Sequence, residues 1–276
     1  MNTFYLNICN IEARVGLTCS PTFFTAVKDR YQEFISDSSS NPPGIDLNIR
    51  VNNQDNLPDV PKPEVTSSDN KLDIKGHAYE TTLQRRNNLW TGNANVQENI
   101  YTLDTLLRIL WAQLLPERNG FLIHACGLIY KGEGFLFPGK SSSGKTTLAR
   151  KAGRDNTLSD ELVGVQITTD GHRIMGTPFW GEFQKGGNPI NCPLQSIYFL
   201  QKAKTVSIQR LSVQDSVKSM LRLILFFGID TNRVNQLLNL AKQCAETLPG
   251  FNICLAKNTN FESIMDLIED QNAVIA

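Results

Sequence analysis

The sequence predicts an α/β protein with a mixed sheet, and three observations support that prediction. Short apolar runs of strand length recur along the chain and alternate with longer segments that have the apolar period of a helix. An Asp-Gly pair at 170–171 separates two strand-like runs, which is a strong hairpin signal. A loop rich in glycine and serine, residues 139–146, lies directly between an apolar run and a helical segment. We expect this loop to organise a nucleotide-binding core, preceded by a small α+β region.

The bulk composition fits a globular protein with a substantial core. Of the 276 residues, 41% are hydrophobic and 20% are charged. The 27 basic and 27 acidic side chains cancel, so the formal net charge is +0. Nonspecific binding to nucleic acid or to an anionic membrane needs an excess of basic charge. We therefore expect neither nucleic acid nor a membrane as a partner.

Targeting signals and cysteine spacing point to a reduced, cytoplasmic environment. The N-terminal residues lack the basic region and apolar stretch of a secretory signal. The most apolar stretch, Leu223–Phe227, is far shorter than the roughly 20 residues that cross a bilayer. The 6 cysteines include no C-x-x-C pair, so we interpret them as reduced thiols rather than disulfides or zinc ligands.

Residues 1–95 are expected to form the N-terminal α+β region, in which short apolar segments alternate with polar loops. The expected elements of this region are strands at Phe4–Ile8 and Ile45–Val51, a helix at Phe23–Ile35, loops at 36–44 and 53–70, and a hairpin of Leu72–Ile74 with His77–Leu83.

Residues 96–276 are expected to form the core. It begins with a helix, Val96–Leu115, which Pro116 ends. Two apolar runs, Phe121–Tyr130 and Phe135–Phe137, indicate central strands of a covered sheet. The elements expected after the glycine-rich loop are a helix at Thr146–Ala152, a hairpin of Val163–Thr168 with His172–Met175, strands at Ser196–Leu200, Thr205–Leu211 and Phe251–Leu255, and helices at Val213–Phe227, Arg233–Thr247 and Asn260–Glu269.

The glycine-rich loop matches the P-loop pattern G-x-x-x-x-G-K-[ST] without a mismatch. Its glycines let the backbone curl so that several N–H groups converge on phosphate oxygens, and the following helix adds the positive end of its dipole. Lys145 has the reach to contact the β- and γ-phosphates, and Thr146 has a hydroxyl that can ligate Mg²⁺. ATP and Mg²⁺ are therefore the expected cofactors. The expected nucleotide-binding residues are Gly139, Lys140, Ser141, Ser142, Ser143, Gly144, Lys145, Thr146 and Thr147.

An acidic pair follows the loop in sequence. Asp160 and Glu161 stand just before an apolar run, so their carboxylates are expected at the edge of the sheet. Phosphoryl transfer to a hydroxyl needs one acidic group to hold the metal and another to take the proton, and adjacent carboxylates can divide those roles. A solvated acidic turn that opens a hairpin fits the same spacing.

Three weaker features complete the set of candidates. Glu182 ends the segment GTPFWGE, residues 176–182, which either faces the same cleft or is a structural turn that packs Trp180 into the core. Residues 184–189, QKGGNP, fit either a lid over the site or an ordinary connector. His124 lies inside the apolar run before the loop, where a lone histidine is usually a core residue.

Together these motifs resemble proteins related to HPr kinase/phosphorylase. The resemblance covers about 121–211 and is carried by His-Ala-Cys-Gly at 124–127, the loop PGKSSSGKTT, LSDE at 158–161, GTPFWGE and PLQSIYFL. The chain is most similar to the HPr-kinase-like proteins found beside peptide-maturation genes, some of which phosphorylate a precursor peptide. HPr kinases share their core with phosphoenolpyruvate carboxykinases, so the resemblance implies a P-loop core of that type. Members of the family are often oligomers, which extends to this chain the expectation of a homo-oligomer.

The resemblance implies a role for each candidate residue. The histidine one strand before the P-loop lies near the phosphates in that family, which matches His124. The first acidic residue after the P-loop helix is the general base there, which matches Asp160. The second helps to hold Mg²⁺, which matches Glu161, although the family more often has aspartate. Glu182 matches a further acidic residue near the metal. The catalytic residues implied are Asp160, Lys145 and His124, and the metal-binding residues are Thr146, Glu161 and Glu182.

Two departures from the family bear on the substrate. Bifunctional HPr kinases carry an acidic residue soon after the first P-loop glycine, where this chain has Lys140. The glycine-rich sequence associated with HPr recognition is not recognisable. Both departures point away from HPr as the acceptor and from pyrophosphate as the donor.

The expected function is an ATP-dependent phosphotransferase that phosphorylates a serine or threonine hydroxyl of a peptide or small protein, in particular a ribosomally synthesised precursor peptide. The alternative is a nucleotide-dependent chaperone or switch in a peptide-maturation complex, without acceptor chemistry. Chemistry on a small molecule, as in the carboxykinases, is disfavoured because those enzymes are considerably longer.

Overall fold

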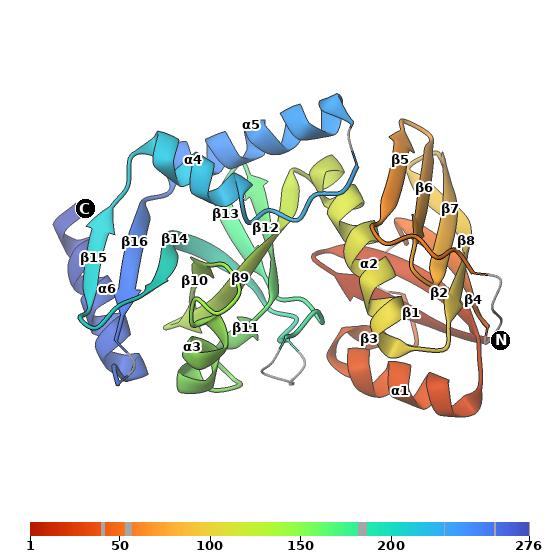
Figure 1. Ribbon diagram of the computed structural model, residues 1–276, viewed down its shortest axis with the longest axis horizontal. Helices are drawn as coiled ribbons and strands as arrows, with labels where there is room; N and C mark the ends of the chain where they lie inside the picture. Colours follow the sequence, from red (N-terminus) through yellow and green to blue (C-terminus); the bar gives the residue numbers. More distant parts are fainter. Residues whose placement is uncertain (40–41, 53–56, 182–186, 229, 257, 276) are drawn as a thin grey trace. The chain divides into compact units, whose positions relative to one another are not determined.

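The computed structural model describes residues 1–39, 42–52, 57–181, 187–228, 230–256 and 258–275. The chain is α/β with mixed sheets, about 30% helix and 42% strand (Figure 1). It divides into two compact units: unit 1 comprises Met1–Arg118 and Phe226–Gln236, and unit 2 comprises Asn119–Leu225 and Leu237–Ala276. The boundary predicted between residues 95 and 96 differs from this division, because helix α2 (Ile100–Leu114) packs on the strands of unit 1.

The described residues of unit 1 form an eight-stranded sheet in the order β3-β1-β2-β4-β8-β7-β6-β5. The pairs β2–β4 and β4–β8 are parallel, and the other neighbours are antiparallel. The strands are β1 (Asn2–Ile8), β2 (Ile11–Thr18), β3 (Ile35–Ser36), β4 (Ile45–Asn52), β5 (Glu64–Ser68), β6 (Lys71–Gly76), β7 (Tyr79–Arg86) and β8 (Leu89–Gln97).

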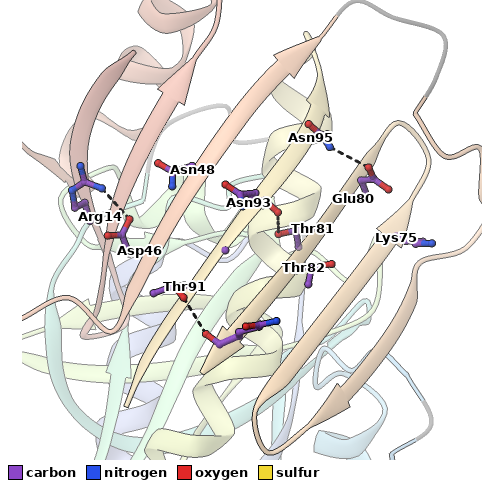
Figure 2. Close-up of a pocket in the computed structure, with 12 residues that line it drawn as sticks. Arg14, Asp46, Asn48, Lys75, Glu80, Thr81, Thr82, Thr91, Asn93 and Asn95 are labelled. Atoms are coloured by element: carbon purple, nitrogen blue, oxygen red, sulfur yellow. Dashed lines mark hydrogen bonds and ion pairs between the residues drawn. The ribbon is translucent and has the colours of Figure 1, made fainter. Parts of the chain in front are cut away.

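One face of this sheet is apolar and the other is polar, as expected of strands whose side chains alternate. On β4, Ile45, Leu47 and Ile49 are buried, while the residues between them are more exposed. Helix α2 covers strands β7 and β8, and the indole of its Trp111 donates to the carbonyl oxygen of Ile8 at 2.9 Å. The polar face forms an open cavity of about 830 Å³ lined by threonine, asparagine and paired charges (Figure 2).

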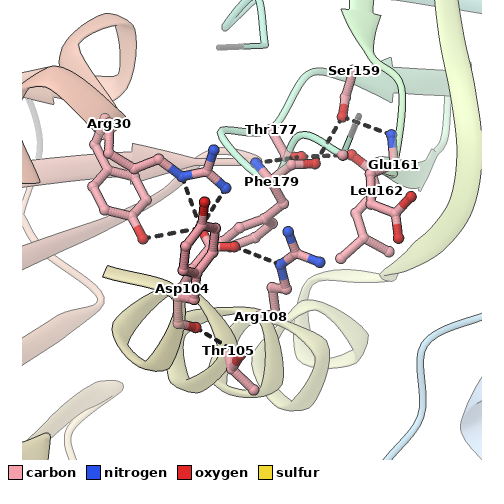
Figure 3. Close-up of polar contacts among 12 residues, drawn as sticks. Arg30, Asp104, Thr105, Arg108, Ser159, Glu161, Leu162, Thr177 and Phe179 are labelled. Carbon is pink, nitrogen blue, oxygen red and sulfur yellow. Dashed lines mark hydrogen bonds and ion pairs between the residues drawn. The ribbon is translucent and has the colours of Figure 1, made fainter. Parts of the chain in front are cut away.

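A buried charge network joins α1 (Pro21–Tyr31) to α2 within unit 1. Asp104 is 3% exposed and accepts hydrogen bonds from Arg30 at 2.9 Å, from Arg108 at 2.8 Å and from the Tyr31 hydroxyl at 3.1 Å (Figure 3). Burial raises the pKa of Tyr31, and the Asp104 charge raises it further. The network ties the two helices together at the cost of desolvating its charges.

Unit 2 contains the glycine-rich loop. Its strands are β9 (Gly120–Tyr130), β10 (Glu133–Pro138), β11 (Thr157–Ser159), β12 (Leu162–Thr168), β13 (Gly171–Met175), β14 (Asn191–Lys202), β15 (Ser207–Arg210) and β16 (Gly250–Leu255), and its helices are α3 (Lys145–Ala152), α4 (Val213–Leu221), α6 (Phe261–Ile275) and most of α5 (Thr231–Thr247).

The strands of unit 2 pair in the order β10-β9-β12-β13-β14-β16-β15, and β10 also pairs with β14. Strand β14 pairs with β13 near its start and with β10 and β16 further along. The pairs β10–β14 and β14–β16 are parallel, whereas β9 is antiparallel to both β10 and β12. Leu148 of α3 and Ile264 of α6 are buried in one apolar cluster with residues of β10, β14 and β16.

The structure corrects several predicted elements. The helix predicted for Val213–Phe227 ends at Leu221, because the apolar residues after it pair with β9 instead. Leu223 accepts from the backbone N–H of His124 at 2.9 Å, and Leu225 donates to Leu122 at 2.8 Å. The helix predicted to begin at Val96 begins at Ile100, and the helix predicted for Phe23–Ile35 ends at Tyr31. Strands β2, β3, β5, β8 and β11 were not predicted.

None of the 6 cysteines, all of which lie in the described part of the chain, forms a disulfide. No helix among the described residues is long and apolar enough to span a membrane.

Candidate functional site

The glycine-rich loop connects β10 to α3, in the order of strand, loop and helix that its sequence predicts. A Cβ on Gly139 would lie 2.2 Å from the Ser143 hydroxyl oxygen, so a larger residue there would displace the Ser143 side chain. Gly144 stands at the N-cap of α3 with φ of 112°, a conformation that L side chains rarely adopt. Gly144 is therefore required by the backbone of the loop, and Gly139 leaves room for the Ser143 side chain.

The first turn of α3 has no side-chain cap. Its N-cap residue is a glycine, which has no side chain to accept a hydrogen bond from the amide N–H groups of the first turn. The positive end of the helix dipole is therefore not balanced by a capping side chain. The Ser143 hydroxyl oxygen beside it is buried and has no hydrogen-bond partner among the described residues. Unsatisfied donors of this kind fit the oxygens of a phosphate group.

Lys145 lies folded against the loop rather than in solvent. Its ammonium donates to the carbonyl oxygens of Gly139 at 2.9 Å and Lys140 at 3.1 Å, and the residue is 7% exposed. Both acceptors are neutral, so the ammonium charge is balanced only by dipoles in these two contacts. An anion held by the loop would offer it a stronger, charge-assisted partner.

Asp160 lies between strands β11 and β12, and its side chain contacts the first turn of α3. The Thr146 hydroxyl donates to its Oδ2 at 3.1 Å, and the backbone N–H of Gly181 donates to its Oδ1 at 2.9 Å. Asp160 is 1% exposed. The Asp160 carboxylate thus contacts both the end of the glycine-rich loop and the GTPFWG segment.

Glu161 pairs with His124 across neighbouring strands. The His124 Nδ1 lies 3.4 Å from Glu161 Oε1, and the two side chains are 37% and 30% exposed. The register of β12 on β9, in which Leu162 lies opposite His124, sets this contact. The pair is accessible to solvent, in contrast to the neighbouring Asp160.

The GTPFWG segment packs against the acidic pair through its backbone. The Ser159 hydroxyl donates to the Phe179 carbonyl at 3.0 Å, and the Glu161 N–H donates to Ser159 Oγ at 3.3 Å (Figure 3). Phe179 is fully buried, and the Thr177 hydroxyl donates to Leu162 at 2.5 Å. The segment is therefore a fixed wall beside the carboxylates. Glu182 and residues 184–186 lie outside the described residues.

Cys126 is a fully buried residue of strand β9. Burial raises the pKa of its thiol, the Asp160 charge raises it further, and the Lys145 charge lowers it. The thiol is therefore neutral at physiological pH and serves as a small buried side chain, as the sequence suggests.

The groups beside the loop fit Mg²⁺ as well as phosphate. Thr146 and Asp160 supply hard oxygen donors, which Mg²⁺ prefers, and this ion completes its shell with water and substrate phosphates. Among the described residues, no group of three or more His, Cys, Asp or Glu side chains is placed to hold a metal ion. Water and phosphate oxygens would supply the remaining ligands of such an ion.

Two cavities beside the loop were missed by sequence reasoning. One, of about 430 Å³, is lined by the loop, the end of β14 and the end of α4. The other, of about 390 Å³, is lined by α3, α6 and the ends of β14 and β16. Their residues come from segments far apart in the sequence, so no local motif marks them.

No protein-family model and no curated protein matches this sequence. The resemblance to HPr-kinase-related proteins therefore rests on the motifs alone.

Proposed function

We propose that the chain is an ATP- and Mg²⁺-dependent phosphotransferase with a P-loop core, acting on a serine or threonine hydroxyl of a peptide or small protein. A ribosomally synthesised precursor peptide is the proposed acceptor class, because the motif resemblance is strongest to proteins of peptide-maturation cassettes. A homo-oligomer is proposed on the same ground.

One observation supports the proposal most directly. The hydroxyl of Thr146, at the end of the loop, is hydrogen-bonded to Asp160 at 3.1 Å. A phosphate held by the loop would thus lie beside a carboxylate rather than beside solvent alone. A simple anion-binding loop has no need of a buried acidic group at that position, since it would repel the ligand.

The transfer would break the bond between the γ-phosphorus and the β–γ bridging oxygen and form a bond to the acceptor oxygen. Lys145 and the loop amides would stabilise the charge on the phosphate oxygens. The hydroxyl proton would pass to a carboxylate of the acidic pair, and ADP would leave. Mg²⁺, when bound, neutralises phosphate charge, and Thr146 with Asp160 would hold it.

The contacts favour a division of the acidic pair that is the reverse of the one implied by the family. Asp160 is buried and bonded to Thr146, which suits a residue that holds the metal. Glu161 is more exposed and paired with His124, which suits a group that receives a proton from an incoming hydroxyl. We therefore propose Glu161, supported by His124, as the proton acceptor.

The proposal is tested by incubating the chain with γ-labelled ATP, Mg²⁺ and candidate precursor peptides, then mapping phosphate on the peptides by mass spectrometry. A phosphotransferase leaves phosphate on a serine or threonine, and omitting Mg²⁺ abolishes that product. ATP turnover that the peptide stimulates without any phosphopeptide would instead support the nucleotide-dependent switch.

A further inference from the structure

The two cavities beside the glycine-rich loop differ in chemistry. The cavity beside α4 is lined by Lys140, Lys202 and Arg222, with no acidic residue among the described residues that form it. The cavity beside α3 is lined by more aliphatic side chains, together with Lys151 and Lys202, and has no acidic residue among the described residues that form it. Its apolar lining residues are Leu148, Leu200, Ala203, Leu255, Ala256 and Ile264.

We infer that the apolar cavity beside α3 binds the base of the nucleotide, an inference that rests on the proposed function. A purine has two apolar faces and fits a mostly hydrophobic pocket with few polar groups. The cavity volume of about 390 Å³ lies in the range of small-molecule sites. The other cavity has Arg222 beside Lys140 and Lys202 and has fewer aliphatic residues, so it offers a base less apolar surface.

The position of the cavity along the loop supports the same assignment. Gly144 and Thr147, in the first turn of α3, line it, whereas Thr146 is bonded to Asp160. A nucleotide laid across this helix end would direct its γ-phosphate toward Asp160 and its base toward Leu200. The triphosphate would then lie over the uncapped amides of α3.

Strand topology places the cavity where α/β proteins bind ligands. It lies beyond Leu200 of β14 and Leu255 of β16, near the carboxyl ends of two parallel strands. Strands of this kind end together and leave a crevice at that edge of the sheet. Ile264 of α6, which is fully buried, also lines the cavity.

The test replaces small residues at the edge of the apolar cavity with tryptophan, so that the indole occupies the space proposed for the base. Ala203 and Ala256 line it without belonging to the buried core, so Ala203→Trp and Ala256→Trp place an indole in the space for the base. The matched control is Ser219→Trp, which places the same side chain in the cationic cavity. Isothermal titration calorimetry with Mg²⁺ measures the affinity of each variant for ATP and for inorganic tripolyphosphate, and circular dichroism checks its folding.

We expect either alanine variant to weaken ATP binding about tenfold or more and to leave tripolyphosphate binding within about twofold, because only the base contacts are lost. The Ser219 variant should change the affinity for both ligands by the same factor, because its cavity is lined by residues 139–143 of the loop and not by the residues proposed to contact the base. Unchanged ATP binding in folded alanine variants overturns the inference, and so does equal weakening of both ligands. Wild-type protein that binds neither ligand overturns the proposed function itself, and the base site falls with it.

Discussion

The polar cavity of unit 1 and the glycine-rich loop of unit 2 differ in how fully their polar groups are hydrogen-bonded within the fold. The unit 1 cavity, of about 830 Å³, is the larger space, and its walls are threonine, asparagine and charges that already pair with one another. Examples are Arg14 with Asp46 at 2.9 Å and Asn95 with Glu80 at 3.1 Å. Such a face is what a sheet that packs on one side only presents to water.

The loop region is smaller but contains groups whose hydrogen-bonding capacity is not met. The Ser143 hydroxyl is buried without a partner among the described residues, and the Lys145 ammonium contacts only neutral carbonyls in the bonds described above. Since unsatisfied buried polar groups cost free energy, their presence indicates a ligand more strongly than an open volume does.

The buried aspartates of the two units differ in the same way. Asp104 in unit 1 is surrounded by Arg30 and Arg108, so its charge is compensated inside the fold. Asp160 in unit 2 accepts from the Thr146 hydroxyl and from the backbone N–H of Gly181, and these two bonds orient the carboxylate beside the glycine-rich loop. The first arrangement stabilises a structure, and the second suits a carboxylate that meets a cation.

The largest expected effect is on the rate of phosphoryl transfer, and it distinguishes the two regions when one lysine in each is replaced by alanine. Lys145→Ala should lower phosphoryl transfer by on the order of 10³-fold, because it removes the charge that faces the transferred group. Lys75→Ala, in the polar cavity of unit 1, should leave the rate unchanged. Single-turnover kinetics with labelled ATP measures both. Equal losses would mean that the unit 1 cavity takes part in the reaction.

Substitutions in the acidic pair are expected to have two different effects, one on the transfer rate and one on the Mg²⁺ requirement. Glu161→Gln should slow transfer on the order of 10²-fold at saturating Mg²⁺, because the proton acceptor is lost. Asp160→Asn should raise the Mg²⁺ concentration needed for half-maximal rate. A Mg²⁺ titration of each variant decides the matter. If the Glu161 variant needs more Mg²⁺ and the Asp160 variant does not, the family-implied assignment holds instead.

The free energy of unfolding should depend on Asp104 of unit 1. Asp104→Asn is expected to destabilise this unit by about 3–5 kcal/mol, because it leaves buried arginine charge uncompensated. Asp46→Asn, in a pair whose side chains are each 33% exposed, should cost about 1 kcal/mol or less. Urea unfolding followed by fluorescence compares the two. Similar losses would show that the Asp104 network is no more than a surface ion pair.

Elements with strong local signals were predicted well. The glycine-rich loop, the apolar run of β9 and the hairpin at Asp170-Gly171 were recognised because turn chemistry and hydrophobic period are local properties. Strand β8 was missed because Gly92, Asn93 and Asn95 have low strand propensity, and its pairing between β4 and β7 decides its conformation. The end of α4 was missed for a similar reason, since residues after it pair with β9.

The sequence by itself determined the glycine-rich loop and named Asp160, Glu161 and His124 as its companions, because residue type and spacing carry that chemistry. Only the tertiary structure decided which carboxylate meets Thr146 and which meets His124, since strand register sets those contacts. It also decided where the two cavities beside the loop lie. Their walls come from strands and helices that meet only when the sheet of unit 2 is assembled.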